Sequence, residues 1–283
     1  MKNIRLILAA LILLFFIILV DAVFIEPYNL KVTENDFDLF EGNDTNVKIV
    51  LISDIHIASQ LDGYLENVVK KINEENADLI LIVGDSINGQ ETELEDLEPL
   101  RDLKAKYGKY AVLGNHDYKK WQCPVPKSSL EMGDKTEKRL EDLGIKVFRN
   151  DNEILEIKGK KFALIGLDDA WVCKNDYAKA SEGISKDIPK VIFMHNQEAI
   201  DLKLPKGKSA ILAGHTHCGQ IQIPFITQFL LKSNGFGEYG MGRVRVDEYT
   251  ELYVTCGVTR GSTVAGIAIR LFTNPEISVI NIN

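Results

Sequence analysis

The chain has only five histidines, and each one directly follows a short apolar run: His56, His116, His195, His215 and His217. Apolar runs of this length, bounded by turn residues, predict buried strands. Side chains at the ends of strands in an α/β sheet gather at one edge, where ligand sites form. Histidines used only for packing would not be expected to share this placement. The pattern therefore predicts a single site built from imidazoles.

Carboxylates and an amide accompany these histidines. Asp54 precedes His56 by two residues, Asp85 follows a glycine at the next strand end, and Asn115 precedes His116. Residues two apart in an extended turn can face the same side, so Asp-x-His and His-x-His pairs can each present two ligands to one volume. Carboxylate, imidazole and amide oxygen suit Mn, Fe or Zn better than Ca.

This ligand set is typical of a site with two divalent cations. Such a site needs one shared ligand, and Asp85 has the central position in the series. Two cations about 3.5–4 Å apart can hold a phosphate and activate a bridging water. Water bound in this way can lose its proton near neutral pH. We therefore expect hydrolysis of a phosphate ester by attack of a metal-bridging hydroxide.

The elements that must position these residues alternate between strands and helices. The first part reads as βαβαβ, which predicts a mainly parallel, buried sheet. The later part is rich in strands, so we expect an α/β (α+β-like) fold with a two-sheet β-sandwich flanked by helices. The expected helices are 61–75, 94–106 and 130–143, with a loop at 121–129. The expected strands are 47–53, 79–83, 110–113, 145–148, 154–157, 162–167, 191–194, 210–213, 243–246, 252–255, 268–272 and 277–282.

Length and composition limit the class of protein. The 283 residues are 45% hydrophobic and 26% charged, which predicts a folded core rather than a disordered chain. The net charge of -8 makes nucleic acid an improbable partner, because sequence-independent binding needs a basic surface. It does not exclude a phosphate substrate, since bound cations reverse the local field.

The N-terminal segment predicts a membrane anchor. An unbroken apolar run covers 6–20, with Lys2 and Arg5 before it and Asp21 after it. The flanking charges predict a cytoplasmic N-terminus and an extracytoplasmic catalytic domain. A secretory signal with a poor cleavage site at Val20 and Ala22 stays open, and it would give a secreted protein. We divide the chain into an anchor or signal (1–25), a linker with an edge strand (26–46) and a catalytic domain (47–283).

The four cysteines allow disulfides in an exported protein. Cys123 and Cys173 each follow a tryptophan by two residues, and we hypothesise that they form a bridge. Four buried free thiols are the equal alternative. The chain has no Cys-x-x-Cys pair, so a structural zinc site is not indicated.

The motifs together resemble those of the calcineurin-like metallophosphoesterases. The resemblance runs from about Lys48 to the C-terminus and is carried, in order, by Asp54-Ile55-His56, Gly84-Asp85, Gly114-Asn115-His116-Asp117, His195 and Gly214-His215-Thr216-His217. Glu26-Pro27 and Cys218-Gly219-Gln220 are similar to the membrane-associated bacterial branch of that family. Members of the branch are described as phosphodiesterases or phospholipid phosphatases.

The resemblance implies a metallo-dependent phosphatase fold and a role for each residue. One cation would bind Asp54, His56, Asp85 and His217, and the other Asp85, Asn115, His195 and His215. His116 would assist the leaving group, and Asp117 would orient the His116 ring. One departure is Asn88, where many relatives have an acidic residue.

Some assignments have competing interpretations. Asp168 and Asp169 follow a strand and are interpreted either as a turn or as a substrate-facing pair. Arg260 is interpreted as a phosphate contact or as a solvated surface residue. We expect a phospholipid or another membrane-proximal phosphate ester as substrate. The alternatives are a nucleotide phosphodiesterase or nuclease and, less favoured, a non-catalytic metal-binding membrane protein.

Overall fold

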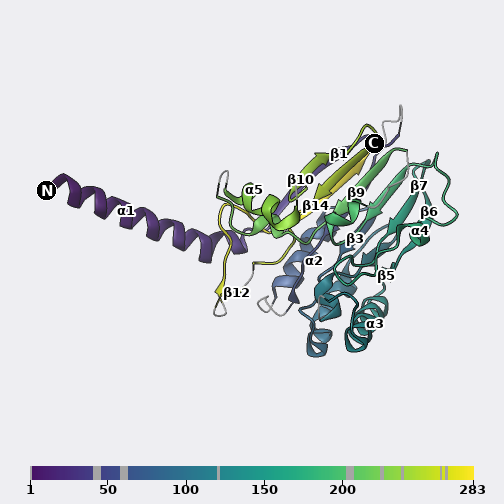
Figure 1. Ribbon diagram of the computed structural model, residues 1–283, viewed down its shortest axis with the longest axis horizontal. Coiled ribbons are helices and arrows are strands. Elements are labelled where there is room, and N and C mark those ends of the chain that lie inside the picture. The colour runs from purple at the N-terminus through teal and green to yellow at the C-terminus, as the bar shows by residue number, and fades with distance from the viewer. Residues whose placement is uncertain are drawn as a thin grey trace.

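The computed structural model describes residues 2–40, 46–57, 63–119, 122–201, 207–223, 226–236, 239–261, 263–264 and 267–283. Within this part of the chain, two six-stranded sheets pack face to face, and helices cover their outer faces (Figure 1). The predicted two-sheet sandwich flanked by helices is confirmed.

The first sheet has the strand order β1-β14-β2-β3-β4-β5. Strands β2 to β5 run parallel, β14 is antiparallel to β2, and β1 is an edge strand parallel to β14. The strand bounds are β1 (Lys31–Phe37), β2 (Val47–Ile52), β3 (Leu79–Val83), β4 (Lys109–Val112), β5 (Lys146–Val147) and β14 (Glu276–Ile282).

The second sheet has the order β10-β11-β9-β8-β7-β6. Its four central strands run parallel, and each edge strand is antiparallel to its neighbour. The strand bounds are β6 (Asp151–Ile157), β7 (Lys160–Gly166), β8 (Lys190–Phe193), β9 (Ser209–Ala213), β10 (Gly242–Arg245) and β11 (Thr250–Val254). A separate hairpin pairs β12 (Thr263–Val264) with β13 (Ile267–Ala268).

Strand β3 shows why the central strands are continuously apolar. Leu79, Leu81 and Val83 face the second sheet, and Ile80 and Ile82 face the helices on the other side. Successive side chains point to opposite faces of a strand, so a strand covered on both faces must be apolar at every position. All five residues of β3 are buried.

The helices lie in two layers. On the outer face of the first sheet are α2 (Tyr64–Glu74), η5 (Glu95–Asp102) and α3 (Lys127–Asp142), and on the second sheet are α4 (Tyr177–Ala180) and η7 (Gln197–Asp201). The helix predicted at 94–106 is a shorter 3₁₀ helix, because Pro99 within it has no N–H to donate. Like η7, the short elements η4 (Glu91–Glu93), η6 (Asn115–Tyr118) and η8 (His217–Gly219) are 3₁₀ helices.

The apolar helix α1 (Lys2–Val20) projects from one end of the sandwich (Figure 1). Within the described residues, the stretch Asn3–Tyr28 is long and apolar enough to span a bilayer. It continues through the π turn η1 (Asp21–Ile25) and the 3₁₀ turn η2 (Glu26–Tyr28) into β1. The segment predicted as a linker therefore begins as helical turns that contact the domain, and the predicted edge strand follows as β1.

Two features of the C-terminal region differ from expectation. The prediction of a strand at 268–272 is wrong after Ala268, where β13 ends. Arg270 is buried in this segment, and its guanidinium donates to the carbonyls of Cys256 and Thr259 instead of facing solvent from a strand. The helix α5 (Ile226–Leu231) and the π turn η9 (Lys232–Phe236) were not predicted. Of the helix expected at 61–75, residues 61 and 62 lie outside the described residues.

Candidate metal centre

Five strand ends bring the predicted ligands to one edge of the sandwich. From the first sheet, β2 leads to Asp54 and His56, β3 to Asp85, and β4 to Asn115 and His116. From the second sheet, β8 leads to His195, and β9 leads to His215 and His217. These strands run parallel within each sheet, so their carboxyl ends meet at the same edge.

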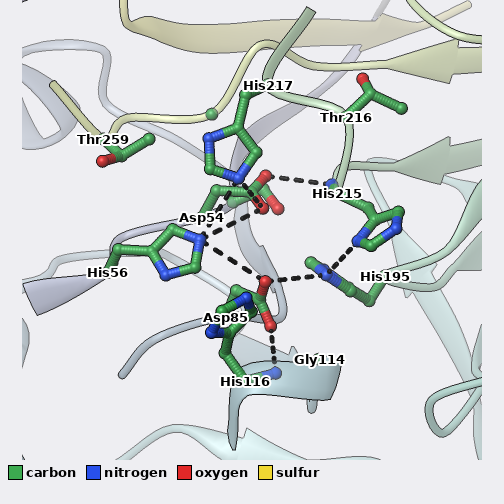
Figure 2. Close-up of polar contacts among 12 residues, drawn as sticks. Asp54, His56, Asp85, Gly114, His116, His195, His215, Thr216, His217 and Thr259 are labelled. Atoms are coloured by element: carbon green, nitrogen blue, oxygen red, sulfur yellow. Dashed lines mark hydrogen bonds and ion pairs between the residues drawn. The ribbon is translucent and has the colours of Figure 1, made fainter. Parts of the chain in front are cut away.

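Two carboxylates form the centre of the cluster, and imidazoles point toward them (Figure 2). His217 Nε2 lies 3.2 Å from Asp54 Oδ1, and His195 Nε2 lies 3.1 Å from Asp85 Oδ2. His56 lies between the two, with Nε2 at 4.0 Å from Asp54 Oδ1 and 3.5 Å from Asp85 Oδ2. Asp85 therefore has contacts on both sides of the cluster.

Glycines permit this close approach. A Cβ added at Gly214 would lie 1.9 Å from Ser53 Oγ and 2.8 Å from Asp54 Oδ2. Gly84 has a φ of +81°, and a Cβ there would lie 2.7 Å from His195 Nδ1. Only glycine avoids both the positive-φ strain and the clash. The glycine before each of Asp85 and His215 is thus required by the packing of the site.

Three imidazoles are oriented through their Nδ1 atoms. Asn88 Oδ1 lies 2.7 Å from His56 Nδ1, the Val83 carbonyl 2.8 Å from His195 Nδ1, and Gln220 Nε2 2.9 Å from His217 Nδ1. In each ring this leaves Nε2 directed at a carboxylate. Partners of this kind fix ring orientation in metal sites. Asn88 and Gln220 are functional residues whose positioning roles sequence reasoning missed.

The donor set fits divalent cations. His56 Nε2 and His217 Nε2 are 3.2 Å apart, and His195 Nε2 and His215 Nδ1 are 3.1 Å apart. Among the residues that the structure describes, the buried atoms Asn115 Oδ1 and His215 Nε2 find no hydrogen-bond partner. Converging ring nitrogens, among them Nδ1 of His215, and the buried Asn115 oxygen fit a site for divalent cations. Possible ligand atoms of Asp54, His56 and His217 lie within 4.8 Å of one another, and so do those of Asp85, His195 and His215.

The electrostatics of the cluster favour metal binding. Burial acts to raise the pKa of Asp54 and Asp85, but the nearby imidazoles outweigh it and hold the pKa of both carboxyls well below their usual range. Burial lowers the pKa of His56 to about 4 and that of His215 to about 3. Burial also acts to lower the pKa of His195, but Asp85 raises it well above its usual value. Ionised carboxylates and neutral imidazoles are the forms that bind metals, so Asp54, Asp85, His56 and His215 are already in the binding form, whereas His195 would release a proton when a cation binds beside Asp85.

His116 stands at the side of the cluster. Its ring lies edge-on to that of His56, with the centroids 4.7 Å apart, and its backbone N–H donates to Asp85 Oδ1 at 2.8 Å. His116 also lies close enough to His56 and Asp85 to be counted as a possible ligand of a third group. It is partly exposed, so it can reach a substrate placed over the carboxylates.

The hydrogen bonds of Asp117 correct its predicted role. One carboxylate oxygen accepts the backbone N–H groups of Gly114 and Asp85, and the other accepts those of Ser86 and Ile87. Two donors on each oxygen leave little capacity to orient the His116 ring. Asp117 instead fixes the turns that follow β3 and β4.

The three residues predicted to contact substrate have other partners. Asp168 accepts from Tyr118 Oη at 2.5 Å and from Arg149 Nε at 3.1 Å, so its carboxylate belongs to a buried ion-pair network. Arg260 lies over the rings of Tyr28 and Tyr64 and donates to Tyr28 Oη, so it connects η2 to the domain. The prediction that these two bind substrate is therefore not supported by their contacts.

Asp169 is buried beside the cluster. Its Oδ1 accepts the Val172 N–H, while its Oδ2 has no hydrogen-bond partner in the described part of the chain. Burial raises the pKa of Asp169 to about 7, against the attraction of His195. It is thus placed close to the metal ligands rather than in an exposed substrate groove.

Both cysteine pairs form disulfides. The hypothesised Cys123–Cys173 bridge is confirmed. The second bridge, Cys218–Cys256, was not predicted; it joins the residue after His217 to the residue that follows β11 by two. The loop it holds has unusual backbone angles, with φ of 73° at His215, 52° at His217 and 53° at Cys218. The bridge therefore fixes a ligand loop that is conformationally strained.

Comparison with known proteins agrees with this geometry. The family model "Calcineurin-like phosphoesterase" matches residues 47–219. An uncharacterized metallophosphoesterase, YkuE of Bacillus subtilis, is 29% identical over 92% of this chain and 87% of its own length. Phosphodiesterase YaeI of Escherichia coli is 24% identical over 91% of this chain and 90% of its own length.

Other similar proteins are larger or more distant. A zebrafish "transmembrane protein with metallophosphoesterase domain" is 31% identical over 83% of this chain, which spans about half (52%) of that protein. A solved structure, the phosphopantetheinyl hydrolase PptH of Mycobacterium tuberculosis, covers 80% of this chain at 12% identity with a TM-score of 0.44.

Proposed function

Because the chain belongs to the calcineurin-like phosphoesterase family and is a metal-dependent phosphoesterase, we propose that it holds two divalent cations and hydrolyses a membrane-proximal phosphate ester. The observation that carries this proposal is the convergence of two buried carboxylates and their imidazoles from five strand ends. Mn, Fe and Zn are the cations that suit these ligands.

The residues divide into two ligand sets that share one carboxylate. Asp54, His56, Asp85 and His217 would hold one cation, and Asp85, Asn115, His195 and His215 the other. Support comes from the position of Asp85 between His56 and His195 and from the buried oxygen of Asn115, to which no described residue donates a hydrogen bond. Bound cations supply an activated water and neutralise charge on the phosphate oxygens.

The remaining work falls to residues of the chain itself. His116 would donate a proton to the leaving oxygen, and support for this role comes from its partly exposed ring, which lies beside that of His56. Asp117 holds the two turns that carry Asp85 and His116 through four backbone N–H groups. Asn88 and Gln220 keep two of the ring nitrogens directed at the carboxylates.

The N-terminal segment favours a single-pass membrane protein with an extracytoplasmic catalytic domain. Lys2 and Arg5 precede the apolar run, as expected for a cytoplasmic N-terminus. The bond from Arg270 N–H to the Ala22 carbonyl, at 3.0 Å, supports an uncleaved anchor, because cleavage at Ala22 would disturb a contact that the folded domain uses. This placement favours a phospholipid or another lipid-linked phosphate as substrate.

A nucleotide phosphodiesterase or nuclease of the same superfamily is the alternative. The name of phosphodiesterase YaeI favours diester cleavage in general. The net charge of -8 disfavours a nuclease, and export would separate the site from cytosolic nucleotides.

A substrate panel tests the proposal. The full-length protein in detergent micelles would be stripped with a chelator, reloaded with Mn, Fe or Zn, and assayed on bis-p-nitrophenyl phosphate, p-nitrophenyl phosphate and phospholipids in mixed micelles. We expect turnover that returns only with metal. An Asp85→Asn variant should lose at least one cation and this turnover. Absence of metal-dependent hydrolysis of every ester in the panel would contradict the proposal.

A further inference from the structure

We propose that the catalytic domain docks on the bilayer through an apolar collar, which places the opening of the metal centre, where His215 and His217 are partly exposed, at the membrane surface. The collar consists of exposed apolar side chains around the end of α1: Phe24, Ile25, Ile221, Ile223, Ile226, Phe229, Leu230, Ile267 and Phe272. This inference rests on the proposed function and selects lipids within the bilayer as its substrate class.

The joint between α1 and the domain is too short to hold the domain away from the bilayer. α1 ends at Val20, and Ala22 is already buried with its carbonyl accepting the Arg270 N–H. Four residues further on, Glu26 accepts the Thr273 N–H through its side chain. If α1 crosses the membrane, the face of the domain around these contacts must lie at the membrane surface.

An apolar groove joins α1 to the collar. A cavity of about 450 Å³ lies between the helix and the domain, lined by Phe16, Ile17, Ile18, Val20 and Ile25 on one side and by Phe272 on the other, with Asp21 as its one charged residue. Phe272 is 55% exposed. The side chains of α1 in this groove would be embedded in lipid, so Phe272 opposite them would be embedded as well. The collar is thus continuous with the membrane-spanning surface.

The helix α5 extends this surface. Its exposed residues Ile226, Phe229 and Leu230 have the i, i+3, i+4 spacing of one helical stripe, while Thr227 and Leu231 are buried on the other side. Phe229 is 70% exposed, which is costly for a phenylalanine in water. Figure 1 shows α5 and the β12–β13 hairpin at the end of the sandwich from which α1 departs. One short apolar stripe beside a membrane anchor is suited to insertion into a lipid surface.

The same segment reaches the metal ligands. Ile221 of the collar follows His217 by only four residues, and the Cys218–Cys256 bridge holds the segment between them. The Phe236 ring, at the end of the π turn after α5, lies 5.6 Å from the His215 ring. The ring of the partly exposed Trp171 also lies beside His215, with the two ring centroids 4.3 Å apart. A lipid entering from the collar would therefore meet apolar rings next to the metal centre.

Charge does not explain this docking. The net charge of -8 would repel the anionic lipids that a basic surface attracts, so attachment must come from apolar insertion. The collar is accordingly expected to insert into bilayers of phosphatidylcholine alone.

A fluorescence measurement tests the docking. All four cysteines are in disulfides, so Phe229→Cys introduces a single free thiol for an NBD dye in the full-length protein. In phosphatidylcholine nanodiscs we expect a blue-shifted emission that doxyl-labelled lipid quenches. The matched control is Ile154→Cys, 44% exposed on β6, which lies far from α1 in Figure 1. The proposal would be overturned if the dye at position 229 showed the same emission wavelength and the same weak quenching by doxyl lipid as the dye at position 154.

A second measurement separates docking from the proposed function. In a Phe229→Ser/Leu230→Ser variant, turnover of phospholipid in nanodiscs relative to turnover of soluble bis-p-nitrophenyl phosphate should fall by about tenfold, because a misplaced opening reduces productive encounters. An unchanged ratio would refute the role of the collar in lipid access. If the wild-type protein hydrolyses neither ester, the proposed function fails, whereas the quenching result still decides whether the collar inserts.

Discussion

The two disulfides should stabilise the fold by similar amounts and yet differ in their effect on metal binding. Cys218 and Cys256 are 38 residues apart, and Cys123 and Cys173 are 50 apart. For loops of these lengths the chain-entropy model gives about 4 kcal/mol for each bridge. Replacing either pair by serine should therefore lower the free energy of unfolding by a comparable amount.

The difference comes from what each bridge holds. Cys218 adjoins the ligand His217, and His215, His217, Cys218 and Gln220 all have positive φ in the same loop. Left-handed φ costs about 1 kcal/mol or more for each such residue, so about 4 kcal/mol of local strain opposes the ligand geometry. Without the Cys218–Cys256 bridge this loop can relax. No predicted metal ligand adjoins Cys123 or Cys173 in the sequence.

The assay compares both serine double variants with the wild-type protein. Unfolding in denaturant reports stability, and mass spectrometry after gel filtration reports metal content. We expect both variants to be destabilised but only Cys218→Ser/Cys256→Ser to lose metal at limiting concentrations. Equal metal retention by the two variants would refute the argument that this bridge maintains the ligand loop.

Three further predictions concern single residues. His116→Ala should lower kcat by about 10²–10⁴-fold with unchanged metal content; loss of metal would instead make His116 a ligand. Gly214→Ala should disrupt metal binding, because its Cβ would lie 1.9 Å from Ser53 Oγ. In the control Gly159→Ala the new Cβ meets no described residue within 4 Å, so this variant should cost only the strain of its positive φ, about 1 kcal/mol. Equal metal loss by the two variants would disprove the steric argument. Burial acts to raise the pKa of Asp78, but Lys158 and the Lys48 N–H outweigh it and hold that pKa below its usual range. Asp78→Asn should therefore cost about 1–3 kcal/mol near neutral pH, and the cost should disappear as pH falls through the folded pKa of Asp78; a cost that persists in acid would contradict this.

The sheets and the ligand cluster could be predicted from the sequence because both follow from local patterns of residues. A strand such as β3, buried on both faces, must be apolar throughout, so its end and the following Asp85 can be located directly. The parallel order of β2, β3 and β4 then brings those ends to one edge. The second bridge had no such pattern, because Cys218 and Cys256 are brought together by the pairing of β9 with β11.

Residues whose role depends on distant partners could not be assigned from the sequence, which left two interpretations open for Asp168 and for Arg260. Asp168 directly follows a strand, as the predicted metal ligands do, but its carboxylate accepts hydrogen bonds from Arg149 and Tyr118. Arg260 was considered as a phosphate contact, but its partner is Tyr28, 232 residues away in the sequence. The collar was missed for a related reason. An apolar stretch such as Ile226 to Leu231 predicts burial, and only the fold reveals that Ile226, Phe229 and Leu230 are exposed.

The most direct test of the two-cation site is a crystal structure of the protein grown with Mn²⁺, with anomalous scattering recorded at the Mn edge. The account predicts two peaks: one among Asp54, His56, Asp85 and His217, and one among Asp85, Asn115, His195 and His215. A single peak, or peaks outside these side chains, would contradict it.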